Sequence, residues 1–298
     1  MKTPRQPMFD VCVVGHVTRD IIRAGGREMQ MPGGTAYYAA LAIKYLGLNV
    51  AVITRVSRGD EGLLERLHQH GVAVLVGDSP RTTTFVNTYA EDLEARRQRL
   101  IDLAAPFAEA DIQGVEARVF HVGALTPGDV PLAVMAALAA KSLISLDAQG
   151  FLRRIDVGGS SQGEVALQDW PEKHRALPLV THLKTDEDEA RVLTGETDPQ
   201  QMALRLSVLC PGEVIITRGS RGSLVYAEGK LHRIPAYPPR RLIDPTGCGD
   251  TYMAAYLYRR RTTNNLTEVG QFAARTATAK LERSGPLAPA PPDASQLS

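Results

Sequence analysis

Cysteine is scarce in this sequence, and neither sign of charge is in excess. The 298 residues include three cysteines, Cys12, Cys210 and Cys248, which lie far apart and form no CxxC pair. This spacing argues against a disulfide framework and a structural zinc site, so we expect reduced thiols in a cytoplasmic protein. Lys and Arg number 34 against 33 Asp and Glu, a balance that predicts no nucleic-acid partner.

Long apolar runs and two common nucleotide motifs are also missing. No stretch approaches the ~20 apolar residues that cross a bilayer, so we expect no membrane-spanning segment. A P-loop would need GxxxxGK followed by Ser or Thr, and a Rossmann fold would need GxGxxG after the first strand; neither is present. Residues 287–298 are rich in Pro, Ala and Ser, which predicts a flexible tail.

Apolar runs alternate with helical patterns along most of the chain. The strand-like runs cover residues 11–15, 51–56, 119–125, 143–148, 179–185 and 213–219, and the helical patterns cover 36–46, 61–70, 131–140, 187–194 and 200–209. Strands that alternate with helices of this length predict an α/β fold, in which helices cover both faces of a mainly parallel sheet.

Two segments interrupt this rhythm. Residues 27–31 form a short mixed run between glycines, and residues 81–90, RTTTFVNTYA, alternate and are rich in Thr, Tyr and Phe. Both patterns are typical of antiparallel strands outside the main sheet. A small β-lid over about 24–32 and 81–100 would explain them, and two surface loops without a role are the alternative.

The most informative stretch is residues 242–258, in which a short apolar strand leads through DPTGCGD into an apolar helical run. The glycines let the backbone turn sharply and approach a ligand, and amides at a helix N-terminus form an anion site. A carboxylate in such a turn repels phosphate, but Asp250 fits there as the base that takes a proton from an attacking hydroxyl. An ordinary turn with an Asp cap is the alternative.

DPTGCGD resembles the DTxGAGD signature of the ribokinase-like (pfkB) carbohydrate kinases. Further stretches are similar to family motifs and come in the family's order: GHVTRD (15–20), PGGTAYY (32–38), VSRGDEG (56–62), TDEDEARVLTG (185–195) and TRGSRGSLVY (217–226). The resemblance implies one kinase domain over residues 8–286, a ribokinase-like three-layer αβα sandwich with a small β-lid. It also implies transfer of the γ-phosphate of ATP to a hydroxyl of a small sugar or polyol.

The resemblance assigns roles to individual residues. Asp250 is the expected base, with the amides of Gly247, Cys248 and Gly249 as the anion hole. The acceptor is expected at Asp20, Gly33, Gly34, Tyr38 and Asp250, and ATP at Asp186, Thr217, Gly219, Gly222, Thr246, Gly247 and Gly249. Glu189 and Asp186 are the expected Mg²⁺ ligands. A monovalent cation and a homodimer formed through the lid are further options that the resemblance leaves open.

Some positions depart from the family pattern. Thr18, Tyr38 and Asp186 stand where family members have asparagine, and Cys248 stands where alanine is usual. The first two bear on acceptor choice. Because Cys248 begins a helix, where positive charge favours the thiolate, we expect alkylation of this thiol to inactivate the enzyme and ATP to protect it. Burial that shields the sulfur is the rival account.

Three stretches resemble the myo-inositol kinase branch of the family: HVGALTP (121–127), DAQGFLRRID (147–156) and LKTDEDEA (183–190). They favour an inositol-like acceptor. A nucleoside kinase of the same family is the alternative, and a non-catalytic sugar-binding regulator on this fold is a third hypothesis. The retained Asp250 and glycines favour catalysis.

Overall fold

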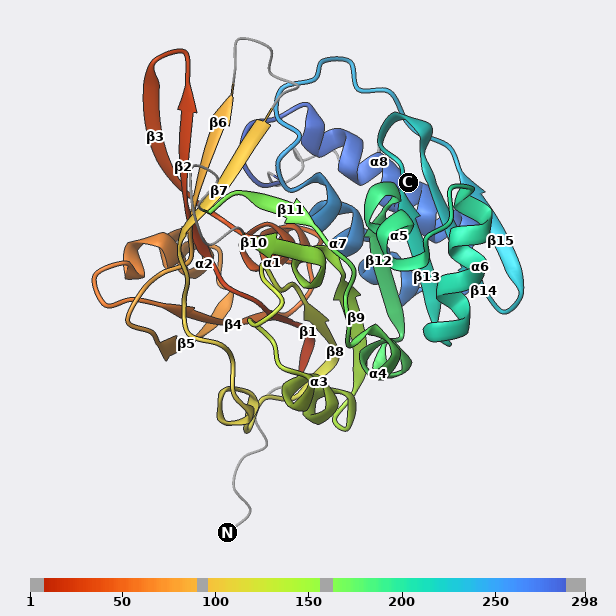
Figure 1. The fold of residues 1–298 in the computed structure, drawn as a ribbon, viewed down its shortest axis with the longest axis horizontal. Coiled ribbons are helices and arrows are strands. Elements are labelled where there is room, and N and C mark those ends of the chain that lie inside the picture. The colour runs from red at the N-terminus through yellow and green to blue at the C-terminus, as the bar shows by residue number, and fades with distance from the viewer. Residues whose placement is uncertain (1–7, 90–95, 156–162, 288–298) are drawn as a thin grey trace.

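One nine-stranded sheet organises the molecule, in the order β15-β14-β13-β12-β9-β8-β1-β4-β5 (Figure 1). The computed structural model describes residues 8–89, 96–155 and 163–287. The seven strands from β13 to β5 are parallel, and β14 and β15 extend the sheet in antiparallel fashion. The strands are β1 (Phe9–Val14), β4 (Val50–Val56), β5 (Ala73–Asp78), β8 (Ala117–Val122), β9 (Leu143–Asp147), β12 (His182–Asp186), β13 (Glu213–Thr217), β14 (Ser223–Ala227) and β15 (Lys230–Ile234).

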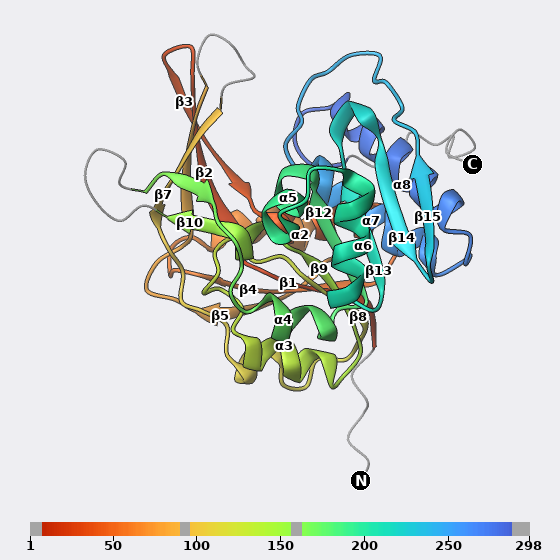
Figure 2. The same cartoon turned by 45° about the vertical axis from the view of Figure 1, so that its right-hand side comes forward.

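Helices cover both faces of this sheet, as the buried apolar strands require. One core contains Leu41 and Met253 from helices on one face, and the other contains Met135 and Leu206 from helices on the opposite face. The first face carries α1 (Thr35–Tyr45), α2 (Glu65–Gln69), α7 (Cys248–Arg260) and α8 (Leu266–Leu281); the second carries α3 (Leu132–Ala139), α4 (Lys173–Ala176), α5 (Glu187–Thr194) and α6 (Pro199–Leu209). Figure 2 shows the resulting layers, which confirm the predicted αβα sandwich.

A four-stranded lid stands away from the sandwich at the upper left of Figure 1. Its order is β3 (Arg27–Gly33), β2 (Thr18–Ala24), β6 (Thr84–Tyr89) and β7 (Arg96–Asp102). The two segments predicted as lid strands are therefore strands, not idle surface loops. The lid also contains β2, which the sequence analysis missed, and β6 pairs with β2 in parallel rather than antiparallel fashion. A hairpin of β10 (Arg153–Ile155) and β11 (Val165–Leu167) lies at its base.

The domain limits remain a prediction. Leu287, the first residue of the expected tail, is buried, and residues 288–298 of that tail and residues 90–95 of the expected lid lie outside the described residues. Among the described residues, no helix combines the length and apolar character needed to span a membrane. Asp147, Asp186 and Thr217 end three neighbouring strands, β9, β12 and β13, where an open parallel sheet binds its ligands.

Candidate active site

The glycine turn before α7 has the sharp backbone turn that the sequence predicted, but the apolar strand predicted to lead into it is absent. Residues 242–246 form no strand, and Leu242 and Ile243 are exposed. Gly247 has a φ of 75°, a left-handed conformation, and a Cβ added to it would lie 2.2 Å from Cδ1 of Tyr38. Only glycine fits both demands. The Cys248 N–H donates to the Pro245 carbonyl at 3.2 Å and closes the turn, so this one of the three amides expected in the anion hole already has a partner. The first amides of α7 thus face the region beside Tyr38 at the positive end of the helix dipole.

Asp250 lies in the first turn of α7 and is partly buried. Burial, and next the nearby charge of Asp147, raise the pKa of Asp250 to about 6. Lys184, a side-chain hydrogen bond from Thr35 and the charge of Arg153 act in the opposite direction and limit the rise. A carboxyl with a pKa near neutrality is a stronger base than an ordinary Asp while still ionised at neutral pH, which suits general-base catalysis.

Lys184 brings a second charge to the same turn. Its Nζ donates to Asp147 Oδ2 at 2.8 Å, and both side chains are buried. A Cβ added to Gly249 would lie 3.0 Å from this Nζ, so the ammonium borders the amides of the anion site. Burial acts to lower the pKa of Lys184, but Asp147 outweighs it and the pKa is raised, so the side chain stays charged.

Lys184 and Asp147 had no expected role, although both lie in stretches that resemble inositol kinases. The sequence feature that could have revealed them is that both are charged residues near the carboxyl ends of apolar strands. Their Cα positions are paired between the adjacent strands β9 and β12, a neighbourhood that the sequence does not reveal. Thr35 and Arg153 were missed for the same reason.

The expected acceptor residues meet on the other side of Asp250. Thr18 Oγ1 donates to Asp20 Oδ1 at 2.7 Å, and a Cβ on Gly33 would lie 2.4 Å from Asp20 Oδ2. Tyr38 is buried between three carboxylates: burial first, and then Asp244, Asp20 and Asp250, raise its pKa and keep the phenol neutral. The structure therefore brings Asp20, Gly33, Tyr38 and Asp250 together.

Gly34 has a structural reason of its own. It precedes α1 with a φ of 86°, and an added Cβ would lie 2.4 Å from the His16 carbonyl oxygen. Its contribution is close packing of α1 against β1 and the segment that follows. The expected role of Gly34 at the acceptor stays a prediction.

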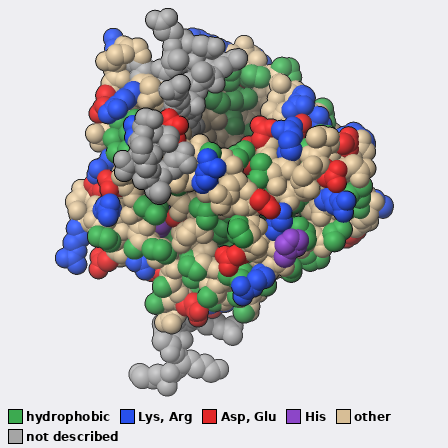
Figure 3. Space-filling view, viewed as in Figure 1, with side chains coloured by type: hydrophobic (Ala, Val, Ile, Leu, Met, Phe, Trp, Pro, Cys, Tyr) green, Lys and Arg blue, Asp and Glu red, His purple; other side chains and the backbone are tan. Residues whose placement is uncertain are grey.

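Polar side chains continue along the lid strands next to Asp20. Asp20 pairs with Phe85, and the next same-face position on β6 is Asn87, which is buried and whose Oδ1 accepts a hydrogen bond from Gln98 Nε2 at 3.0 Å. The Arg153 guanidinium lies 5.3 Å from the Phe85 ring centroid. This face of the lid therefore combines amides, a carboxylate and a guanidinium. Figure 3 shows that the molecule is hollowed between the lid on its left and the α5 side on its right.

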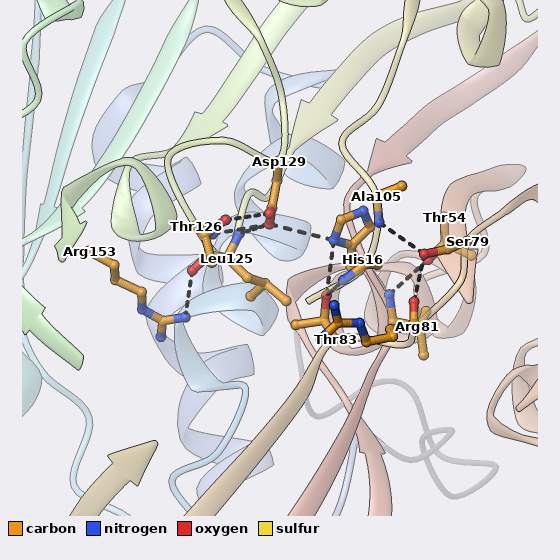
Figure 4. A network of polar contacts seen from close by, with 12 residues as sticks. His16, Thr54, Ser79, Arg81, Thr83, Ala105, Leu125, Thr126, Asp129 and Arg153 are labelled. Atoms are coloured by element: carbon orange, nitrogen blue, oxygen red, sulfur yellow. Dashed lines mark hydrogen bonds and ion pairs between the residues drawn. The ribbon is translucent and has the colours of Figure 1, made fainter. Parts of the chain in front are cut away.

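A buried network anchors Arg153 and the lid (Figure 4). His16 Nδ1 lies 3.2 Å from Thr83 Oγ1 at the start of the lid and 3.6 Å from Asp129 Oδ2. Asp129 accepts the Leu125 N–H at 2.8 Å, and the Leu125 carbonyl accepts from Arg153 at 3.1 Å. Burial lowers the pKa of His16, so the ring is neutral and acts as a structural link.

Asp186 and Glu189, the expected magnesium ligands, form a capping box at the start of α5. The Asp186 N–H donates to Glu189 Oε2 and the Glu189 N–H donates to Asp186 Oδ1, both at 2.8 Å. Burial raises the pKa of Glu189 to about 7; Lys184 opposes the rise, and Asp147 and Asp186 add to it. The part of the chain that the structure describes contains no cluster of three or more metal-ligating side chains.

The capping box engages one oxygen of each carboxylate. A second oxygen remains on Asp186 and on Glu189, which suits a magnesium ion held mainly by donor phosphates and water rather than by an all-protein cage. The residues present thus fit the expected ion in this looser role.

The expected nucleotide residues follow the neighbouring strand. Thr217 is paired with Asp186 across β13 and β12, and its Oγ1 donates to the Thr185 carbonyl at 3.2 Å. Gly219 and Gly222 close the turn after β13, and a Cβ on Gly222 would lie 2.1 Å from the Ile234 carbonyl oxygen. The structure brings this turn beside the capping box.

Thr246 is held by the other loop of the site. Its N–H donates to Asp244 Oδ1 at 2.9 Å, immediately before the Gly247 turn. Its expected contact with donor phosphates stays a prediction.

For the thiol of Cys248, the structure favours the rival account, a shielded sulfur, over the reactive thiolate. Its thiol contacts the Ala277 carbonyl oxygen at 3.6 Å, and burial raises the pKa of Cys248 to about 12. The desolvation of the sulfur outweighs the helix N-terminus, so this cysteine is a protonated packing residue rather than a reactive thiolate.

Comparison with known proteins decides the family. Residues 8–293 match the model of the pfkB family of carbohydrate kinases. The chain belongs to this family. It is 28% identical to the cytidine kinase of Thermococcus kodakarensis, over 84% of this chain and 88% of that protein. It is 27% identical to the inositol 3-kinase of Zea mays, over 84% of this chain and 66% of the maize protein.

A solved structure matches this chain in three dimensions. This pfkB kinase is similar, with a TM-score of 0.84 and 28% identity over 94% of this chain and 97% of that chain, to a pyrophosphate-dependent kinase of the ribokinase family complexed with a pyrophosphate analog and myo-inositol. The predicted family, the ribokinase-like fold and a phosphotransferase activity on an alcohol group are thereby confirmed. The identities of the phosphate donor and of the acceptor belong to the proposed function.

Proposed function

We propose that this kinase phosphorylates a hydroxyl of a cyclic polyol of the inositol class, with Asp250 as the base. The observation that carries the proposal is the meeting of Asp250, with its pKa of about 6, and the polar acceptor side around Asp20 at the mouth of an anion-binding helix turn. A polyol ring needs several hydrogen-bond partners around it. Asp20, Asn87 and Gln98 offer carboxylate and amide groups on one face of the lid, and the Arg153 guanidinium lies over Phe85 of the same face.

The steps follow from these positions. Asp250 accepts the proton of the attacking hydroxyl, whose oxygen forms the new bond to the transferred phosphorus as the bond to the leaving phosphate oxygen breaks. The amides of Gly247 and Gly249 and the Lys184 ammonium stabilise negative charge on the transferred group. A magnesium ion near Asp186 and Glu189 would supply further charge neutralisation on the donor phosphates. The lid, when closed over the acceptor, excludes water and so limits wasteful hydrolysis of the donor.

ATP is the proposed donor, because the turn of Thr217, Gly219 and Gly222 lies beside the proposed phosphate site, where it could contact the nucleoside part of ATP. Pyrophosphate is a second candidate, since the similar solved structure belongs to a pyrophosphate-dependent kinase. Both donors present a diphosphate unit to the same amides. Turnover with each donor at equal magnesium concentration separates them.

A nucleoside acceptor is the alternative to a polyol, because the cytidine kinase of Thermococcus kodakarensis is a relative of comparable identity. The lid argues for the polyol. Phe85, an aromatic ring on which a base could stack, is covered by the Arg153 guanidinium, and the position beyond it carries the Asn87 amide. We also propose that the protein is cytoplasmic and that it forms a homodimer through the lid.

The test is an acceptor panel with purified protein, magnesium and either donor. We expect turnover with myo-inositol or a related cyclitol to exceed turnover with ribose, fructose, adenosine and cytidine. Turnover confined to nucleosides would replace the polyol with the nucleoside assignment. Phosphorylation of no acceptor, despite binding of one, would favour a regulator on this fold.

A further inference from the structure

Lys280 is a fully buried cation outside the reacting groups described above. It lies near the end of α8, its side chain is 0% exposed, and its Nζ lies among three oxygens. These are the Asp244 carbonyl oxygen at 2.8 Å, Asp244 Oδ2 at 3.1 Å and the Arg283 carbonyl oxygen at 3.4 Å. A charged group is buried in this way only when partners compensate the loss of water.

The loop that Lys280 holds leads directly into the anion site. Asp244 accepts the Thr246 N–H at Oδ1 (2.9 Å) and the Gly285 N–H at Oδ2 (3.0 Å). Burial acts to raise the pKa of Asp244, but these hydrogen bonds and Lys280 outweigh it and hold the pKa below the usual value. Three residues after Asp244, Gly247 begins the turn that presents the amides. The geometry of the anion site therefore depends on a carboxylate that Lys280 neutralises.

The charge of Lys280 also reaches the helix N-terminus. Burial raises the pKa of the Cys248 thiol, and the positive charge of Lys280 acts against that rise, while Asp244 adds to it. Cys248 is the first residue of α7, next to the amides on which negative charge would develop. Lys280 therefore offsets the negative charge of Asp244 near this helix start, a charge that would otherwise repel an anion.

The oxygens around the Lys280 ammonium are of the type that bind a monovalent cation. Carbonyl and carboxylate oxygens that replace a hydration shell are typical potassium ligands, and an ammonium group is a compact point charge of the same valence. Here the Lys280 Nζ already contacts these oxygens, so the site does not fit the monovalent cation that the family resemblance leaves open.

We propose that Lys280 is a built-in monovalent cation, a positioning residue that orders residues 244–247 and adds positive charge behind the anion site. The kinase then needs no added potassium. The expected effect of Lys280 on rate rests on the proposed phosphoryl transfer. The replacement of a bound ion by an ammonium group does not depend on which donor or acceptor the enzyme uses.

Chemical rescue tests this role. Parent enzyme is assayed at constant ionic strength in choline chloride and in KCl, and its rate should change less than about twofold. Lys280→Ala opens space for an ion, and its kcat in choline should fall at least about tenfold, as expected when a charge-stabilising group worth more than 1.4 kcal/mol is lost. Potassium or ammonium chloride should restore much of that rate, and lithium chloride should not.

Two further variants separate charge from packing. Lys280→Met retains most of the side-chain volume, leaves no room for an ion, and should be slow with every salt. Lys141→Ala is the matched control, because Lys141 Nζ also donates to two carbonyl oxygens, of Ile112 and Val115, at a distance from the site. Its rate should not respond to potassium.

Thermal melting gives a readout that needs no substrate. Potassium should raise the Tm of Lys280→Ala relative to choline, and should not raise the Tm of the parent or of Lys141→Ala. If no acceptor is turned over but this selective shift is seen, the proposed function fails and the built-in cation stands. A parent enzyme that requires potassium, or a folded Lys280→Ala protein whose rate and Tm ignore potassium and ammonium, overturns the proposal.

Discussion

Asp250→Asn should make the protein more stable and nearly inactive. The ordinary Asp pKa of 3.8 is raised to about 6 at this position, chiefly by burial and then by Asp147. A folded-state pKa above the unfolded value means that the ionised carboxylate destabilises the fold. This cost is fully present above about pH 6 and disappears as the pH falls from the folded toward the unfolded value.

The size of the effect follows from the shift. About two pKa units correspond to about 3 kcal/mol at neutral pH, and partial exposure of Asp250 reduces the expected gain to about 1–3 kcal/mol. Asn retains the shape of Asp, and the N-cap of α7 is Gly247, so this change removes no helix cap. It cannot accept the hydroxyl proton, so kcat should fall about 10²–10⁴-fold, the usual contribution of a general base.

Three measurements on the variant check this: kcat, donor binding, and denaturant unfolding at several pH values. The matched control is Asp198→Asn at the N-cap of α6, where the exposed carboxylate accepts the Gln200 and Gln201 N–H groups. That change should leave turnover and its pH dependence as they are. A folded Asp250→Asn protein with turnover within a few-fold of the parent would refute the base assignment. A stability gain that does not diminish in acid would refute the burial argument.

Four further predictions concern the surroundings of the base. Lys184→Met should lower kcat by about 10²-fold. It also removes a charge that lowers the pKa of Asp250, so the acid limb of the kcat/KM profile should move above its parent midpoint near pH 6. An acid limb that does not move contradicts the interaction between Lys184 and Asp250. Gly247→Ala should lower stability by about 1–3 kcal/mol in denaturant unfolding, because it combines a left-handed backbone with a clash. Cys248→Ala should keep turnover within a few-fold of the parent, and inactivation by a thiol reagent that alanine abolishes would revive the reactive thiolate. Asn87→Leu should raise KM for the polyol with little effect on donor KM, measured by steady-state kinetics; equal effects on both contradict a lid contact.

Much of the fold was predictable because its signals are local. Alternating apolar runs and helical patterns indicated the sandwich, and the Thr-rich run that became β6 indicated the lid. The strand β2 escaped because its residues Thr18 to Ala24 mix Arg, Asp and Ile, and their strand character comes from pairing with β3 and β6. Pairing between distant segments is a tertiary effect that propensity cannot supply.

The site divides in the same way. Asp250 and the glycines of its turn were predictable from the spacing of one motif, since the backbone conformation, the helix start and the base lie within seven residues. The partners that tune the base come from elsewhere: Asp147 from β9, Lys184 from β12 and Arg153 from β10. Nothing in the local sequence of these residues indicates that they converge. The expectation of a reactive thiolate at Cys248 was limited in the same way, because burial by α8 decides its pKa and the sequence shows only the helix start.

Two buried lysines therefore complete a turn that its own motif leaves short of positive charge. The DPTGCGD turn contains two carboxylates, Asp244 and Asp250, and no basic residue, yet it must bind a phosphate. Lys280 neutralises Asp244 behind the turn, and Lys184, held by Asp147, stands beside Gly249. With the first carboxylate neutralised, Asp250 is the one left to act as a base, and its negative charge is offset where the phosphate would lie. This arrangement explains how a carboxylate and a phosphate can share one glycine turn, the feature of the sequence that first pointed to phosphoryl transfer.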